Sequence, residues 1–240
     1  MRIQIASDLH FEHHADGGRA FIRSMPVVGD VLVLAGDVHL ALSLRSVLRQ
    51  FAAKWPYVIA VAGEREYFHS DPATVVREIM AIEHELPNVA YLNNGSAIAI
   101  HGQRFIGGTL WFPDRPDNVL FQGPLVEFNT VRHFVPWVYA NNRQTVRALR
   151  ESLRRDDVLV THYPPSETCL HARYRGSPIS RFFFSPIDDV LLSAQPKLAV
   201  CGHTHAGVDL SIGSTRVVCN PLGYPREGAH SFDPAFVVDV

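Results

Sequence analysis

Cysteine is scarce in this chain, with only Cys169, Cys201 and Cys219 among its 240 residues. An odd and small number of cysteines cannot form the paired disulfide framework of a small secreted domain, and free thiols fit a reducing compartment. No apolar run approaches the roughly 20 residues that cross a membrane. No basic segment followed by an apolar one, the pattern of a secretory signal, precedes the first apolar stretch. The sequence therefore predicts a cytoplasmic protein without a membrane anchor.

An excess of positive charge is also missing. The 22 Lys and Arg residues are balanced by 24 Asp and Glu residues, which gives a net charge of −2. Non-specific nucleic-acid binding depends on a basic surface, so nucleic acid is not an expected partner. Apolar residues make up 47% of the chain, which allows a sizeable core and excludes a disordered protein. The length fits one domain over residues 1–240, and no particular oligomeric state is predicted.

Apolar strands alternate with helical patterns along much of the chain. Strands are expected at 2–7, 30–35, 56–61, 95–101, 103–109, 157–161, 197–200, 207–212, 215–219 and 235–239. Helices are expected from Leu40 to Phe51, at 71–85 with Asp71 as N-cap, at 141–153 and at 186–194. Residues 110–140 and 163–185 lack periodicity and are expected to be irregular. Early strands that are apolar on both faces and late hairpins together predict an α/β sandwich of two sheets flanked by helices.

Histidine, with 13 residues, is unusually common, and several histidines follow predicted strands. Asp8 and His10 follow the first strand, Asp37 the second, His162 the strand at 157–161, and His203 and His205 the strand at 197–200. In α/β sheets, ligands bind beyond the carboxyl ends of the strands. A chance scatter of Asp and His would not favour one edge of the sheet. These residues are therefore predicted to form one metal site.

The mixture of carboxylates and imidazoles also indicates which chemistry the site performs. Such ligands suit Mn, Fe or Zn ions better than Ca²⁺. Asp37 is placed to bridge two divalent ions. Two metals about 3.5–4 Å apart can polarise a phosphate and supply hydroxide as the in-line nucleophile, so no Ser or Cys nucleophile is required. The sequence thus predicts metal-dependent hydrolysis of a small phosphorylated substrate, either a phosphomonoester or a phosphodiester.

The ordered set of motifs resembles the calcineurin-like metallophosphoesterases. That family shows Asp-x-His, Gly-Asp, Gly-Asn-His-Glu/Asp, a lone His and Gly-His-x-His. This chain shows Asp8-Leu9-His10, Gly36-Asp37, Gly63-Glu64-Arg65-Glu66, His162 and Gly202-His203-Thr204-His205 in the same order. Asn220-Pro221-Leu222-Gly223-Tyr224 is also similar to bacterial members.

The resemblance implies a four-layer α/β/β/α sandwich of two mixed sheets flanked by helices. It also implies how the ligands are shared between the two ions. The first metal would be held by Asp8, His10, Asp37 and His205. The second would be held by Asp37, His162 and His203, with Asp37 bridging.

The chain departs from the family pattern at Glu64 and Arg65. The family has an Asn ligand where this chain has Glu64, and a His that contacts phosphate where it has Arg65. Glu64 can still bind the second metal, although its charge would make that metal a weaker Lewis acid. Arg65 cannot be a general acid, because its pKa lies above about 12, but it can hold phosphate oxygens. In the family this His is often assigned as the general acid that protonates the leaving group. Without such a donor the rate falls on the order of 10²–10⁴-fold for a poor leaving group, so we expect this chain to prefer substrates with good leaving groups.

Several alternatives stay open. Glu64 could be a solvent-facing loop charge, Arg65 could form a structural salt bridge, and His39 could either support the site or have no role there. The aromatic residues at 111, 112, 134, 137 and 139 could be core packing or a pocket wall. Arg173, Tyr174 and Arg175 in the 163–185 loop could meet an anionic substrate. The chain could also be a degenerate member that binds metal or a phosphorylated ligand with little or no turnover. A scaffold without metal would leave the ligand set unexplained.

Overall fold

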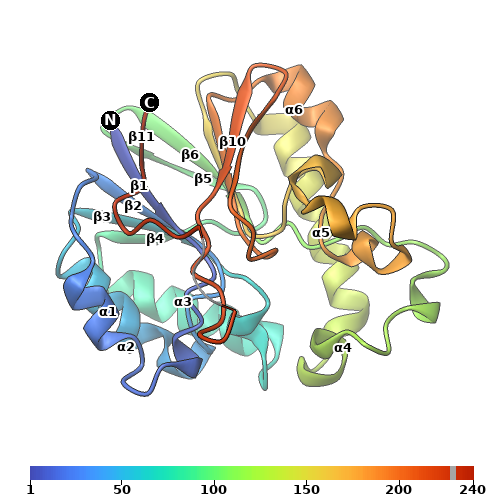
Figure 1. Cartoon of the computed structure of the whole chain (residues 1–240), viewed down its shortest axis with the longest axis horizontal. Coiled ribbons are helices and arrows are strands. Elements are labelled where there is room, and N and C mark those ends of the chain that lie inside the picture. The colour runs from blue at the N-terminus through green and yellow to red at the C-terminus, as the bar shows by residue number, and fades with distance from the viewer. Residues whose placement is uncertain (228–230) are drawn as a thin grey trace.

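Two β-sheets pack face to face, and helices cover both outer faces (Figure 1). The computed structural model describes residues 1–227 and 231–240. The first sheet has the strand order β11-β1-β2-β3-β4, and the second has the order β5-β6-β7-β8-β10-β9. Both sheets are mixed, because β11 in the first and β5 and β9 in the second run antiparallel to their neighbours. The predicted four-layer α/β/β/α sandwich is confirmed.

The strands of the first sheet are β1 (Arg2–Ala6), β2 (Val31–Ala35), β3 (Tyr57–Val61), β4 (Val89–Tyr91) and β11 (Val237–Asp239). The strands of the second are β5 (Ser96–Ile100), β6 (Gln103–Gly108), β7 (Val158–Thr161), β8 (Leu198–Cys201), β9 (Val208–Ile212) and β10 (Thr215–Cys219). The helices α1 (Arg19–Ser24), α2 (Ala41–Ala52) and α3 (Pro72–Glu85) cover the first sheet. On the other side of the molecule lie α4 (Val126–Thr130), α5 (Phe134–Ser152) and α6 (Asp188–Ala194).

The continuous apolar strands are explained by burial on both faces. Successive side chains of a strand point to opposite faces of its sheet. In β2, Leu32 and Leu34 pack in the cluster that contains the apolar face of α2, whereas Val31 and Val33 pack against the second sheet. The core between the sheets also contains the fully buried Phe105 of β6.

Three predictions about the elements were wrong or incomplete. Helix α5 begins at Phe134 rather than near residue 141, and residues 110–140, predicted to be irregular, contain α4. The first turn of α5 was hidden by Pro136, because a proline disfavours helical backbone at the residue before it, and Val135 indeed has non-helical angles. Helix α1 and strand β4 were not predicted, since each is too short to show a period.

Cys169, Cys201 and Cys219 are free and buried, and all three pack as small side chains in the hydrophobic core. Within residues 1–227 and 231–240, no helix is both long and apolar enough to cross a bilayer.

The predicted N-cap of α3 gives a direct test of the local fold. Asp71 accepts a hydrogen bond from the backbone N–H of Thr74 at 2.9 Å, and Pro72 occupies the first helical position. We expect Asp71→Ala to lower the free energy of unfolding by ~1 kcal/mol in urea denaturation, because this N–H loses its partner. Asp71→Asn should keep most of the wild-type free energy of unfolding, since Asn is an equally good N-cap residue. Equal losses in the two variants would contradict the capping role.

Candidate metal centre

The carboxyl ends of strands from both sheets meet at one place, and each is followed by a predicted ligand. In the first sheet β1 leads to Asp8 and β2 to Asp37, while in the second β7 leads to His162 and β8 to His203. Backbone hydrogen bonds hold these ends together within each sheet, from Asp8 N to Gly36 O at 3.0 Å and from Gly202 N to His162 O at 2.9 Å. All seven predicted ligands belong to groups whose binding atoms lie close together.

Glycines make this close approach possible. A Cβ atom at Gly63 would lie 2.1 Å from Asp37 Oδ1, and one at Gly36 would lie 2.2 Å from His162 Nδ1. Both distances are shorter than real Cβ contacts, so no larger residue fits without displacing a candidate ligand. The glycines that precede the motif residues therefore provide the space in which the ligands meet.

The backbone of the site is held in an uncommon conformation. Positive φ angles occur at Asp8 (53°), His10 (46°), Asp37 (56°), His203 (73°) and His205 (49°). Non-glycine residues rarely adopt this left-handed region, and each one costs on the order of 1 kcal/mol or more. Such strain persists only where the surrounding structure imposes it, and it gathers here at the candidate ligands.

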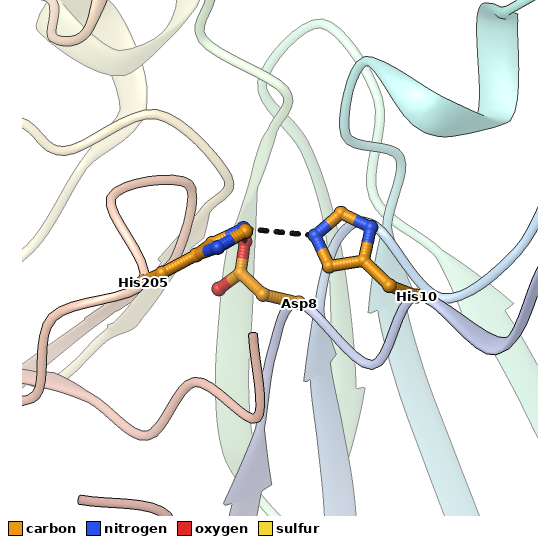
Figure 2. Close-up of side chains that lie close together, drawn as sticks. All are labelled: Asp8, His10 and His205. Atoms are coloured by element: carbon orange, nitrogen blue, oxygen red, sulfur yellow. Dashed lines mark hydrogen bonds and ion pairs between the residues drawn. The ribbon is translucent and has the colours of Figure 1, made fainter. Parts of the chain in front are cut away.

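The first cluster contains Asp8, His10 and His205 (Figure 2). The Nε2 atoms of the two histidines lie 2.8 Å apart. Each Nδ1 faces a carboxylate, Glu12 at 3.1 Å for His10 and Glu227 at 2.6 Å for His205. Because an ionised carboxylate only accepts hydrogen bonds, each Nδ1 is placed to donate, and an Nε2 lone pair of each ring would then point at the other. That arrangement is repulsive unless a proton or a metal cation lies between them.

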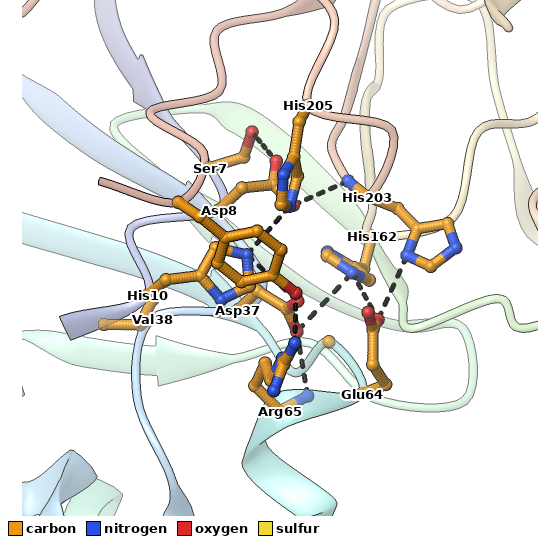
Figure 3. A network of polar contacts seen from close by, with 12 residues as sticks. Ser7, Asp8, His10, Asp37, Val38, Glu64, Arg65, His162, His203 and His205 are labelled. Atoms are coloured by element: carbon orange, nitrogen blue, oxygen red, sulfur yellow. Dashed lines mark hydrogen bonds and ion pairs between the residues drawn. The ribbon is translucent and has the colours of Figure 1, made fainter. Parts of the chain in front are cut away.

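The second cluster contains Glu64, His162 and His203 (Figure 3). Nδ1 of His162 donates to the carbonyl of Ala35 at 2.7 Å, so its Nε2 is directed at Glu64 Oε2, 2.9 Å away. The same carboxylate oxygen lies 3.1 Å from Nδ1 of His203. The Glu64 side chain is only 12% exposed, so it is not the solvent-facing charge that was one alternative.

Asp37 lies between the two clusters. Its Oδ2 is 3.6 Å from Nε2 of His10, and its Oδ1 is 3.6 Å from Nε2 of His162. The carboxylate is fully buried, and among the described residues Oδ2 has no hydrogen-bond partner. Burial and the nearby Glu64 charge raise the pKa of Asp37 well above its usual range. An ionised carboxylate here is therefore unfavourable unless a cation compensates it, and its two oxygens are directed at one cluster each.

Glu66 anchors the backbone around Asp37, a role that the sequence did not reveal. It is fully buried and accepts the N–H groups of Val38 at 2.8 Å, Gly63 at 2.8 Å and Asp37 at 3.2 Å. Burial raises the pKa of Glu66 to about 7, even though these N–H groups favour its ionised form. Glu66 thereby joins the loop after β2 to the loop after β3, which carry Asp37 and Glu64.

Arg65 lies at the edge of the site between two aromatic rings. Its guanidinium carbon is 4.6 Å from the ring centre of Phe68 and 5.2 Å from that of Tyr224. The guanidinium donates a hydrogen bond to the Tyr224 hydroxyl, and its Nε lies 3.9 Å from Glu12 Oε1. The side chain is 19% exposed, so it can reach a ligand at the mouth of the site while it keeps these contacts.

The aromatic residues of the 110–140 region mainly pack in the core, which was one of the two alternatives left open by the sequence. Trp111, Phe112 and Phe134 are buried and join Tyr163, whose ring centre lies 4.0 Å from that of His203. Tyr163 thus links this core to the second cluster.

The 163–185 loop does not direct Arg175 toward a substrate. Its guanidinium donates to the loop carbonyls of Leu170 at 2.9 Å and Thr168 at 2.6 Å. The Arg173 side chain lies outside the described part of the chain, and Tyr174 is 45% exposed.

Besides Glu66, four residues near the clusters were not predicted to contribute to the site. Glu12, Tyr224 and Glu227 contact the candidate ligands or Arg65, and Glu127 of α4 is buried close enough to Glu64 to feel its charge. Glu12 lies two residues after His10, and Tyr224 is part of the segment quoted for its resemblance. The sequence around Glu12 and Tyr224 does not indicate which residues they contact. Glu127 and Glu227 lie in stretches without periodicity, so their positions in the fold could not be predicted either.

The chain is similar to one family model and to several solved structures. A family model described as calcineurin-like phosphoesterase matches residues 1–207. A search of curated proteins found no match. Among solved structures, a phosphopantetheinyl hydrolase from Mycobacterium tuberculosis is similar, with a TM-score of 0.71 and 19% identity, covering 99% of this chain and 95% of that one. A dimetal phosphatase from Danio rerio has a TM-score of 0.55 and 13% identity, covering 98% and 89%. At these identities the structural likeness shows a shared fold.

The burial of Glu127 predicts a pH-dependent stability. Burial, reinforced by the Glu64 charge, raises the pKa of Glu127 to about 7, whereas the unfolded chain titrates near 4.5. Between these values the unfolded state ionises while the folded state keeps its proton, so stability falls as pH rises and levels off above pH 7. We expect Glu127→Gln to remove this loss. The free energy of unfolding of Glu127→Gln, relative to that of the wild type, should rise by on the order of 2–3 kcal/mol between pH 5 and pH 8 in the presence of a chelator.

The measurement is urea denaturation at the two pH values. Glu151→Gln, at an exposed position on α5, serves as the control and should show no such growth. A difference between Glu127→Gln and the wild type that is the same at both pH values would show that Glu127 ionises normally in the fold.

Proposed function

Since the chain belongs to the calcineurin-like phosphoesterase family, we propose that it hydrolyses a phosphomonoester or phosphodiester with two divalent metal ions. The observation that carries this proposal is the place of Asp37, whose two oxygens face two separate ligand clusters. We further propose that residues 1–240 form one catalytic domain, because candidate ligands come from both sheets.

The residues present fit a pair of metal ions. Asp8, His10 and His205 would hold the first ion, Glu64, His162 and His203 the second, and Asp37 would bind both. The buried Asp37 oxygen without a partner and the opposed Nε2 atoms of His10 and His205 are the groups that a cation would stabilise. Mixed carboxylate and imidazole donors favour Mn, Fe or Zn. When bound, two such ions supply Lewis acidity toward phosphate oxygens and a hydroxide nucleophile at neutral pH.

Arg65 is proposed to bind the phosphate. Its guanidinium is already oriented by the Tyr224 hydroxyl and enclosed by two aromatic rings, so little side-chain freedom is lost when it binds an anion. A guanidinium can hold two phosphate oxygens and stabilise charge that develops on them. It cannot give a proton to the leaving group, which therefore departs as an anion. We propose that the site prefers substrates with acidic leaving groups.

Glu64 adds a negative charge where the family has a neutral Asn. A second ion held by this carboxylate would be a weaker Lewis acid than one held by an amide. The same carboxylate supports a second candidate function, because it already pairs with His162 and His203 and can compensate their charge without a metal. In that case the chain would bind a phosphorylated ligand with little or no turnover.

The substrate is proposed to be small and phosphorylated. The chain has no net positive charge that would favour nucleic acid. The structural similarity to a phosphopantetheinyl hydrolase suggests one concrete compound class, phosphopantetheine esters, to be compared with simple aryl and alkyl phosphates.

Metal content and turnover test the proposal together. We expect purified protein supplied with Mn²⁺ to bind two ions per chain and to hydrolyse an aryl phosphate. Removing a group that only hydrogen-bonds to a metal ligand typically lowers activity by ~10–100-fold. Asp37→Asn should lower the rate of hydrolysis by more than this, because Asp37 would bind both ions. Asp156→Asn, at an exposed position, is the control. One ion or none, without turnover in the wild type, would favour the binding function instead.

The leaving-group preference is tested by replacing Arg65 with the residue that the family carries. Arg65→His should speed the hydrolysis of an alkyl phosphate relative to an aryl phosphate by on the order of 10²-fold or more, because an imidazolium can donate a proton. The ratio of the two kcat/KM values is the measurement, with Arg65→Lys as a variant that keeps the charge. If both substrates change equally in Arg65→His, Arg65 does not set this preference.

A further inference from the structure

The segment Asn220–Glu227 lies beyond the residues that the family model matches and passes over the first cluster. Asn220 donates to the carbonyl of Ile5 at 2.7 Å, which fixes the start of the segment to β1. The backbone N–H groups of Leu222 and Gly223 then donate to the carbonyls of Ser7 at 3.0 Å and Asp8 at 2.9 Å. The segment is thus attached to the same turn that carries Asp8.

Glu227 is the residue that this attachment brings to His205. Its Oε2 lies 2.6 Å from Nδ1 of His205 and also accepts the backbone N–H of Tyr224 at 3.0 Å. The carboxylate is 48% exposed, whereas His205 is 16% exposed, so Glu227 approaches the ring from the solvent side. Nε2 on the opposite edge of the ring points at His10 and lies 3.8 Å from Asp8 Oδ1.

We infer that Glu227 is a positioning residue that holds His205 in the Nδ1–H tautomer and directs Nε2 at the first metal. The inference rests on the proposed function, since it concerns the ion that this function requires. A carboxylate on Nδ1–H excludes the tautomer whose Nε2 carries the proton, restricts rotation of the ring and makes Nε2 a stronger donor. Without Glu227, His205 has to select its tautomer and orientation when the ion arrives.

The matching contact on the other histidine supports this role. Glu12 Oε1 lies 3.1 Å from Nδ1 of His10, so each imidazole of the first cluster is held by its own carboxylate. Glu12 is 9% exposed and also approaches Arg65 and His13, which makes its removal harder to interpret. Glu227 is the better residue to test, because the backbone bonds of Leu222 and Gly223 still hold the segment when its carboxylate is gone.

The experiment compares Glu227→Ala and Glu227→Gln with the wild type and with Glu151→Ala, an exposed control on α5. Mn²⁺ binding is measured by isothermal titration calorimetry. We expect Glu227→Ala to weaken one of the two sites by about 10–100-fold and leave the other near its wild-type value. Glu227→Gln keeps an uncharged acceptor and should fall between, whereas Glu151→Ala should match the wild type.

A second readout needs no metal. Long-range ¹H–¹⁵N spectra of chelator-treated protein report which ring nitrogen of each histidine carries the proton, and His205 is assigned by its loss in His205→Asn. We expect the wild type to show the Nδ1–H form and Glu227→Ala to shift toward the Nε2–H form. Circular dichroism of both Glu227 variants shows that they are folded, and Glu227→Gln carries the test if Glu227→Ala is not.

The two readouts separate the inference from the proposed function. Unchanged metal affinities together with an unchanged His205 tautomer in a folded Glu227 variant would overturn the inference. A wild-type protein that binds no metal would overturn the proposed function instead. The tautomer would then decide the inference by itself, since a retained Nδ1–H form in the variant excludes a positioning role.

Discussion

A fully buried carboxylate at the junction of the two sheets, Asp37, is the interaction on which the rest of the site depends. An isolated ionised carboxylate in a protein interior is strongly unfavourable unless hydrogen bonds or cations compensate it. Here the backbone N–H of Arg65 donates to Oδ1 of Asp37 at 2.9 Å, but Oδ2 of Asp37 has no hydrogen-bond partner among the described residues. The surroundings therefore compensate only part of the charge. The fold therefore places a carboxylate that a cation would stabilise at the point where two groups of ligands face each other.

Keeping Asp37 there requires a rigid frame. Glu66 joins the loops after β2 and β3 through three backbone N–H groups, and glycines leave no room for side chains between the ligands. The left-handed backbone angles at the candidate ligands show that the frame imposes a conformation these residues would not adopt alone. Local stability is thus given up for a fixed arrangement of donors, which is the condition for a preorganised site.

Much of this could be predicted from the chain alone, because the relevant signals are periodic and local. The apolar strands, the N-cap of α3 and the hairpin turning at Gly102 each follow from short-range rules. That the predicted ligands would meet followed from their positions after parallel strands, since such strands end at one edge of a sheet.

The contributions of Glu12, Glu66 and Glu227 could not be predicted, because a carboxylate that supports a ligand is recognised only by what it touches. Glu227 shows the difficulty best. It reaches His205 across 22 residues of sequence, through a segment whose course is set by backbone bonds to the turn after β1. Helix α4 was missed for another reason, since aromatic packing of Phe128 rather than an amphipathic period holds it in place.

The pairing of β11 with β1 has a consequence for the order in which the molecule can assemble during synthesis. β1 is made long before β11, and one of its edges stays unpaired until Val237–Asp239 is available. The side-chain amide of Gln4 donates a hydrogen bond to the carbonyl of Pro234, which is also made long after β1. Contacts this distant in sequence form slowly, and an open strand edge can meanwhile pair with another chain. On the ribosome, the turn that carries Asp8 therefore gains its last backbone partners only when Leu222 and Gly223 have emerged, and the first sheet is completed only when β11 has emerged.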